Sequence, residues 1–231
     1  MGPSTSEDHR LSTGTRCVVR GDAVANRCDD GSVTHPLESV YSAWTAHVAG
    51  STSERLARPS RAAAWSVKEL LLHQLLDARR ALVALATPAT GEPDVDEVSY
   101  WRPFRPDEGD GGAAHARFVV ACAAAYDQGQ LVEEWRGTSA AVVHAASSST
   151  STVVSTQGHA LTVESFCSTL VVEATVHLLD AYGTPPADAL SQTVDVLTRI
   201  RGRALAGDDA DEVLRATGRL PSGEADYPLL G

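Results

Sequence analysis

Lysine is almost missing from this sequence, since only Lys68 among its 19 Lys and Arg residues is a lysine. Methionine occurs once, and Phe, Trp and Tyr together make up 5% of the 231 residues. Alanine, valine and arginine are used freely instead, a bias typical of proteins encoded by GC-rich bacterial genomes. The bias describes the host and says nothing directly about the fold.

The chain also lacks a basic excess. Its 30 Asp and Glu residues outnumber 19 Lys and Arg residues, which gives a net charge of -11. Binding to nucleic acid or to an anionic membrane surface requires a positively charged face. The charge therefore argues against both partners and favours a soluble protein that stays apart from other acidic molecules.

Long apolar runs are absent as well. No uninterrupted stretch reaches the roughly 18 residues that a membrane span needs. Residues 1–30 contain no sustained apolar run, so they do not look like a secretory signal peptide. We therefore expect a cytoplasmic protein whose residues 1–33, rich in Ser, Thr, Gly, Asp and Arg, form a flexible leader.

Cysteine is scarce, and its four copies form no CxxC pair, so a structural zinc knuckle is not indicated. Cys122 and Cys167 lie in apolar helical segments and are predicted to behave as small core residues. Cys17 and Cys28 lie in the leader. A disulfide between them is left open, although a cytoplasmic setting disfavours it.

Apolar residues recur at helical spacing through the rest of the chain. The pattern predicts an all-α fold, with a helical bundle over residues 34–205 and a helical tail over residues 206–231. Helices are expected at residues 34–49, 66–86, 113–135, 162–181, 187–204 and 210–216. In the third of these, residues 113–135, the side chains expected to face inward are Phe118, Val119, Cys122, Tyr126, Leu131 and Val132.

Segments between the helices carry the remaining expectations. Ser66 and Glu69 form a capping box at the start of the second helix. A long loop follows that helix and contains Tyr100 and Trp101. Residues 145–156 are read as a Ser/Thr-rich link. No strand pair is predicted, because the β-prone run at residues 152–154 is too short.

Helix 162–181 carries the first chemical clue. It is apolar on most sides, which is typical of a buried helix, yet it contains Glu173 and His177. Because they are four residues apart, both point the same way. A buried, unpaired carboxylate costs several kcal/mol, so something must compensate it. Pairing with His177 or a neighbouring Arg is one possibility, and a bound metal ion is the other.

A third candidate ligand comes from the second helix. His73 lies among leucines, a context in which a lone histidine is more often a hydrogen-bonded core residue. Together with Glu173 and His177 it completes a set of two imidazoles and one carboxylate. Such a set leaves coordination positions open, as catalytic zinc and non-haem iron sites do.

Two stretches of the sequence carry a family resemblance. Residues 65–73, Trp-Ser-Val-Lys-Glu-Leu-Leu-Leu-His, resemble the W-(S/T)-V-x-(D/E)-L-x-x-H signature of the maleylpyruvate isomerase N-terminal, DinB-like superfamily. Residues 173–180, Glu-Ala-Thr-Val-His-Leu-Leu-Asp, resemble its second signature, Glu-x-x-x-His on the last bundle helix. The resemblance covers roughly residues 35–205 and implies a DinB-like four-helix bundle with extra C-terminal helices.

The resemblance also implies a chemistry. The matched positions His73, Glu173 and His177 bind zinc or another divalent metal in that family. Many members use mycothiol, the small thiol of actinobacteria, as co-substrate. The expected function is therefore a thiol S-transferase or isomerase acting on a small electrophilic molecule. The alternatives are a non-catalytic metal- or ligand-binding bundle and a hydrolase that uses metal-bound water.

Departures from the family pattern limit what the resemblance implies. The family's isomerase has a further C-terminal α/β domain, for which the residues after 205 are too few, so maleylpyruvate is not implied as substrate. The tail motif Thr217-Gly218-Arg219 is similar to one in relatives and makes Arg219 a pocket candidate. A homodimer is left open.

The remaining candidates are weaker. Asp77 and Asp180 each follow a ligand histidine by about one turn and could orient its imidazole, or could be surface charges. Tyr100 and Trp101 could wall a pocket or pack on the bundle. His144 and His159 could reach the site but are more often surface residues. The sequence contains no G-x-S-x-G elbow and no phosphate-binding glycine loop.

Overall fold

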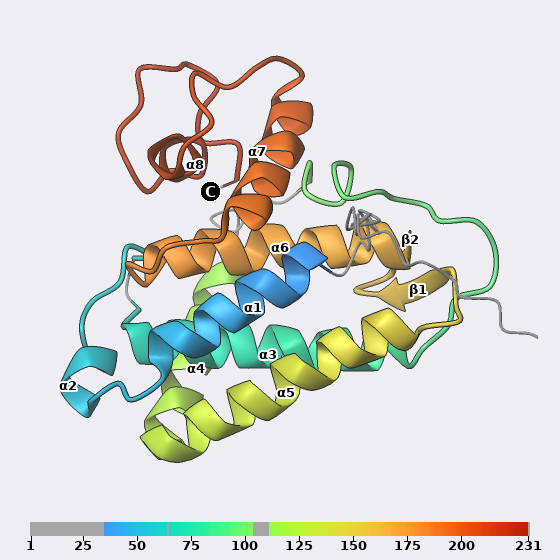
Figure 1. Ribbon diagram of the computed structural model, residues 1–231. Coiled ribbons are helices and arrows are strands. Elements are labelled where there is room, and N and C mark those ends of the chain that lie inside the picture. Colours follow the sequence, from blue (N-terminus) through green and yellow to red (C-terminus); the bar gives the residue numbers. More distant parts are fainter. Residues whose placement is uncertain (1–34, 64, 104–110, 231) are drawn as a thin grey trace, which may run out of the picture. The chain divides into compact units, whose positions relative to one another are not determined.

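The computed structural model describes residues 35–63, 65–103 and 111–230 (Figure 1). The expected leader, including Cys17 and Cys28, lies outside these residues. No helix in the described part of the chain is long and apolar enough to cross a membrane. In chain order the elements are α1 His35–Val48, α2 Ser53–Leu56, α3 Val67–Leu85, α4 Gly111–Ala125, α5 Gln128–Ser148, β1 Val153–Thr156, β2 His159–Thr162, α6 Val163–Asp180, α7 Ala187–Arg201 and α8 Ala210–Ala216.

Helices α1, α3, α5 and α6 form a four-helix bundle and lie side by side in Figure 1. Each of the four packs against two others, α1 against α5 and α6 and α3 against α5 and α6. Trp44, Trp135 and Phe166 are among the largest side chains that are fully buried between them. Truncating one such aromatic side chain to Ala costs about 3–5 kcal/mol. The expected mostly helical fold with a four-helix bundle is confirmed.

The start of α3 shows how local sequence fixes an element. The Ser66 hydroxyl accepts a hydrogen bond from the backbone N–H of Glu69, and the Glu69 carboxylate accepts one from the backbone N–H of Ser66. This is the capping box that the sequence predicted. A similar cap begins α6, where the Thr162 hydroxyl accepts a hydrogen bond from the backbone N–H of Ser165.

The prediction of a single third helix over residues 113–135 is wrong, because two helices, α4 and α5, cover this region. The chain breaks between α4 and α5, because the Asp127 carboxylate accepts hydrogen bonds from the N–H groups of Gly129 and Gln130 and starts a new helix there. Helix α5 then runs to Ser148, through part of the segment read as a link. Of the side chains expected to face inward, Val119 and Leu131 are fully buried, but Phe118 is 54% exposed.

The absence of a strand pair was likewise a wrong prediction. Strands β1 and β2 form an antiparallel hairpin in which Val153 pairs with Thr162 and Thr156 with His159. The two turn residues, Gln157 and Gly158, both have positive φ, 49° and 82°. Two-residue turns of this kind favour Gly because they require positive φ. His159 begins β2, and β2 leads directly into α6.

A second apolar cluster lies on the other side of α6. Val172, Val176 and Leu179 of α6 pack there against residues from α7, α8 and the C-terminal segment, including Val213 and Leu230. Helix α6 is therefore buried on two opposite sides, by the bundle and by the C-terminal elements. This explains why almost every residue of α6 from Ser165 onward is buried.

Candidate metal centre

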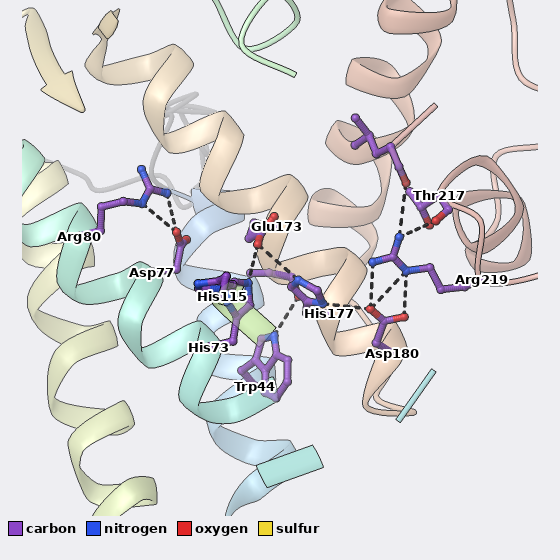
Figure 2. A network of polar contacts seen from close by, with 12 residues as sticks. Trp44, His73, Asp77, Arg80, His115, Glu173, His177, Asp180, Thr217 and Arg219 are labelled. Carbon is purple, nitrogen blue, oxygen red and sulfur yellow. Dashed lines mark hydrogen bonds and ion pairs between the residues drawn. The ribbon is translucent and has the colours of Figure 1, made fainter. Parts of the chain in front are cut away.

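Three side chains from two helices meet within the bundle (Figure 2). His73 projects from α3, and Glu173 and His177 project from α6. Oε1 of Glu173 lies 2.8 Å from Nε2 of His73 and 3.3 Å from Nε2 of His177. One ligand atom from each residue lies within 4.8 Å of the other two. No other set of three His, Cys, Asp or Glu side chains in the described residues meets this condition.

The three side chains fit a divalent ion. Two ligands bound to one tetrahedral zinc, each about 2.0–2.1 Å from it, are roughly 3.3 Å apart. The separations of 2.8 and 3.3 Å around the Glu173 oxygen are close to this value. Two imidazoles and one carboxylate are donors typical of zinc and of other divalent transition metals, and they leave a position for a further ligand.

The two α6 side chains of the candidate site are held in place from a third helix. Glu173 and His177 lie one turn apart, so they share a face of α6. Between them, the backbone carbonyl of Ala174 accepts a hydrogen bond of 2.9 Å from the indole N–H of Trp44 in α1. Trp44 is fully buried. The contact ties α1 to α6 at the height of the candidate site.

Asp180 lies where a residue that orients His177 should lie. Its Oδ2 is 2.9 Å from Nδ1 of His177. A carboxylate in this position holds the proton on Nδ1 and leaves the Nε2 lone pair for a metal. Arg219 follows α8, and its Nε lies 3.3 Å from Oδ1 of Asp180. The guanidinium therefore compensates the charge of this buried carboxylate. Figure 2 shows the chain of contacts from Arg219 through Asp180 to His177.

Asp77 is placed differently. Its Oδ1 accepts a hydrogen bond of 3.0 Å from Nε of Arg80, one turn further along α3. Arg80 also donates to the Thr156 hydroxyl at 3.0 Å. No hydrogen bond joins Asp77 to His73 among the described contacts. The Asp77 carboxylate therefore neutralises Arg80 instead of orienting the imidazole of His73.

A pocket of about 740 Å³ opens beside the three side chains. Volumes of roughly 300–1,000 Å³ are usual for small-molecule sites. Asp77, Tyr100, Trp101 and Arg219, all candidates from the sequence, line this pocket together with His73, Glu173 and His177. Asp180 does not line it and reaches it only through its partners.

The charges of the site are coupled. Burial raises the pKa of Glu173, but the charge of His177 and hydrogen bonds from His177 and His73 outweigh burial and hold it well below its usual value. Burial lowers the pKa of His177, but Glu173 and Asp180 raise it to about 9. A dication can take the place of the proton on Nε2 of His177, because both compensate the Glu173 carboxylate.

Sequence reasoning missed one histidine of the pocket. His115 of α4 lines it, and its Nε2 lies 3.2 Å from Nδ1 of His73. It stands in an alanine-rich helix, outside either signature, so no sequence pattern singled it out. Burial and the charge of His73 lower the pKa of His115. His159 also lines the pocket, whereas His144 is an exposed residue of α5 outside it.

Comparison with known proteins gives one match. No curated protein and no solved structure matches the chain. The model of the family described as mycothiol maleylpyruvate isomerase N-terminal domain matches residues 37–182. The matched region spans α1 to the end of α6 and so includes His73, Glu173 and His177. The chain therefore belongs to the family of the mycothiol maleylpyruvate isomerase N-terminal domain, a DinB-like family.

Proposed function

We propose that the protein is a metal-dependent enzyme that uses a low-molecular-weight thiol, mycothiol, to act on a small electrophilic molecule. His73, Glu173 and His177 would hold the divalent ion, with zinc as the favoured metal. The observation that carries the proposal is the meeting of these three side chains at the wall of a 740 Å³ pocket. The family to which the chain belongs supports the choice of thiol.

The donor set and the pocket argue against a plain scaffold. A structural zinc site is closed by four protein ligands, whereas a catalytic site keeps a position for substrate. Here three side chains meet, and the described residues offer no fourth His, Cys, Asp or Glu to the set. A buried Glu–His pair would compensate charge equally well, but it would not require a pocket beside it.

The chain's own residues would divide the work. A bound dication lowers the pKa of a coordinated thiol or water and so supplies a nucleophile at neutral pH. Glu173 contributes a negative charge, so the site would bind a dication more tightly than two neutral imidazoles could on their own. Asp180 keeps the proton of His177 on Nδ1. Tyr100 and Trp101 line the pocket and would offer an aromatic surface to the substrate.

Two outcomes are chemically consistent with a thiol nucleophile. In both, sulfur forms a bond to an electrophilic carbon of an unsaturated substrate, and the electron pair of the double bond moves onto the neighbouring carbon. A transferase protonates that carbon and keeps the new C–S bond. An isomerase lets the former double bond rotate, then breaks the C–S bond and releases the thiol unchanged.

The decisive experiment combines metal analysis with a thiol-adduct screen. Purified protein, reconstituted with zinc, is incubated with mycothiol and a panel of small electrophiles, and adducts or isomers are read by mass spectrometry and chromatography. We expect about one zinc per chain and thiol-dependent turnover. Only trace metal in both the purified and the reconstituted protein would refute the metal site. Turnover that is unchanged without thiol would favour the hydrolase alternative with metal-bound water.

A further inference from the structure

His115 makes a contact that the proposed function leaves unexplained. Its Nε2 lies 3.2 Å from Nδ1 of His73, and the two rings meet edge to face with centroids 5.3 Å apart. Figure 2 shows the two imidazoles together beside Glu173. His115 comes from α4, which packs on α3 and is not one of the four bundle helices.

The geometry of His73 restricts what this contact can be. Its Nε2 faces Glu173 at 2.8 Å, so Nε2 is the nitrogen that would bind the metal. A neutral imidazole that offers the lone pair of Nε2 must carry its proton on Nδ1. That N–H needs an acceptor, and Nε2 of His115 is the partner that the described contacts give to Nδ1 of His73.

We propose that His115 is a positioning residue that accepts a hydrogen bond from Nδ1–H of His73 and thereby directs Nε2 of His73 toward the metal. The inference rests on the proposed metal site and deepens it. Each candidate ligand histidine then has its own outer partner on Nδ1, Asp180 for His177 and His115 for His73. Outer partners of this kind fix the tautomer and the orientation of a ligand ring.

An imidazole partner has a property that a carboxylate lacks, because it can donate as well as accept. Without metal, Nε2–H of His73 can donate to Glu173 while Nε2–H of His115 donates to Nδ1 of His73. With metal, the His73 proton lies on Nδ1 and the His115 proton on its own Nδ1. Each ring keeps one proton, and the hydrogen bond between them reverses direction.

The first test measures zinc affinity by competition with a chromophoric chelator. His115→Ala removes the acceptor and should weaken zinc binding by about 10–100-fold, the usual effect of losing an outer partner, while the limiting stoichiometry stays at one. His115→Gln places a carbonyl oxygen near the position of Nε2 and should restore most of the affinity. His144→Ala, at an exposed histidine outside the pocket, is the matched control and should match the wild type.

The outcomes separate this inference from the proposed function. No zinc binding by the wild type would refute the metal site itself, and His115 with it. Zinc binding by the wild type with unchanged affinity in His115→Ala would refute only the role of His115. If His115→Gln binds as weakly as His115→Ala, the contribution is not that of a hydrogen-bond acceptor, and the proposal is also wrong.

A spectroscopic measurement tests the reversal directly. Long-range ¹H–¹⁵N correlation spectra of ¹⁵N-histidine-labelled protein distinguish the two neutral tautomers of an imidazole, and His115→Gln assigns the signal of His115. Addition of zinc should move the His115 proton from Nε2 to Nδ1. A role confined to packing would leave its tautomer unchanged, which would overturn the proposal.

Discussion

His73 and Glu173 are 100 residues apart in the sequence, and Nε2 of one lies 2.8 Å from Oε1 of the other. The contact joins α3 to α6 across the bundle. An ion held by His73, Glu173 and His177 would therefore crosslink two helices, so metal content and stability should be linked.

Chelation should lower the melting temperature. Zinc at 100 times its Kd adds about 2.7 kcal/mol to the free energy of unfolding. In a domain of this size that is a melting-temperature shift of about 5–11 °C. Calorimetry with zinc and with a chelator measures it. His177→Ala should bind no stoichiometric zinc and show no shift, whereas the control His144→Ala should behave as the wild type. Equal melting temperatures for loaded and chelated wild type would contradict the link.

Glu173→Gln should damage the site more than loss of an outer partner does. The substitution keeps the size of the side chain but removes its negative charge, and an amide oxygen is a weaker ligand than a carboxylate. We expect zinc affinity and thiol-dependent turnover to fall by more than the roughly 10–100-fold typical of outer partners. Chelator competition and steady-state kinetics measure the two effects. Wild-type activity in Glu173→Gln would rule out a ligand role for this carboxylate.

The cysteines should be dispensable, because the proposed nucleophile is an external thiol. Cys167 is fully buried in the bundle core, and burial raises the pKa of its thiol to about 12. Neither Cys122 nor Cys167 lines the pocket. Replacing all four cysteines by Ala should spare the thiol-dependent reaction once any loss of stability at Cys167 is allowed for. Abolished turnover in a variant that still folds and binds zinc would implicate a protein thiol.

His47 should make stability depend on pH. Burial lowers its pKa below the ordinary value, although a hydrogen bond to the carbonyl of Ala181 opposes this. Because the folded state favours the neutral ring, its stabilisation is present above the unfolded pKa of about 6.5 and is lost as pH falls. Urea unfolding in chelator at pH 7.5 and 5.5 should show a smaller pH-dependent loss for His47→Gln than for the wild type. Equal losses of unfolding free energy in the two proteins would contradict a contribution from His47.

Removal of residues 1–30 should leave folding and metal content unchanged. This expectation comes from the sequence alone, in which residues 1–30 have no apolar periodicity that could pack on the bundle. Melting temperature and zinc stoichiometry of the truncated protein test it. A large drop in melting temperature would show that the leader contributes to the fold.

Periodicity and capping chemistry were enough to predict the bundle. The apolar spacing of α1, α3 and α6 and the capping box at Ser66 are local features, so they could be read directly. The break at Asp127 was missed because good helix formers on both sides, alanines before it and Leu131, Glu133 and Glu134 after it, continue a helical pattern that the aspartate cap overrides. The hairpin was missed because the β-prone run at residues 152–154 was judged too short on its own, without the turn that Gln157 and Gly158 form after it.

In the candidate site, too, the features that could be predicted are local in the sequence, and those that were missed depend on tertiary packing. His73, Glu173 and His177 could be proposed because two of them share a helix face and the third stands out among leucines. The sequence spacing could not show that Asp77 and Asp180 have different roles, because each follows a histidine by about one helical turn. Their different roles depend on Arg80 and Arg219, whose positions are set by tertiary packing. His115 depends in the same way on how α4 packs against α3.

The bond from Trp44 to the carbonyl of Ala174 fixes the alignment of α1 along α6. Successive residues of an α-helix are rotated by about 100°. A slip of α6 by a single residue would bring a different carbonyl to the indole and turn both Glu173 and His177 away from His73. One buried tryptophan, far in the sequence from either signature, thus fixes the rotation and axial position of α6 at which Glu173 and His177 face His73.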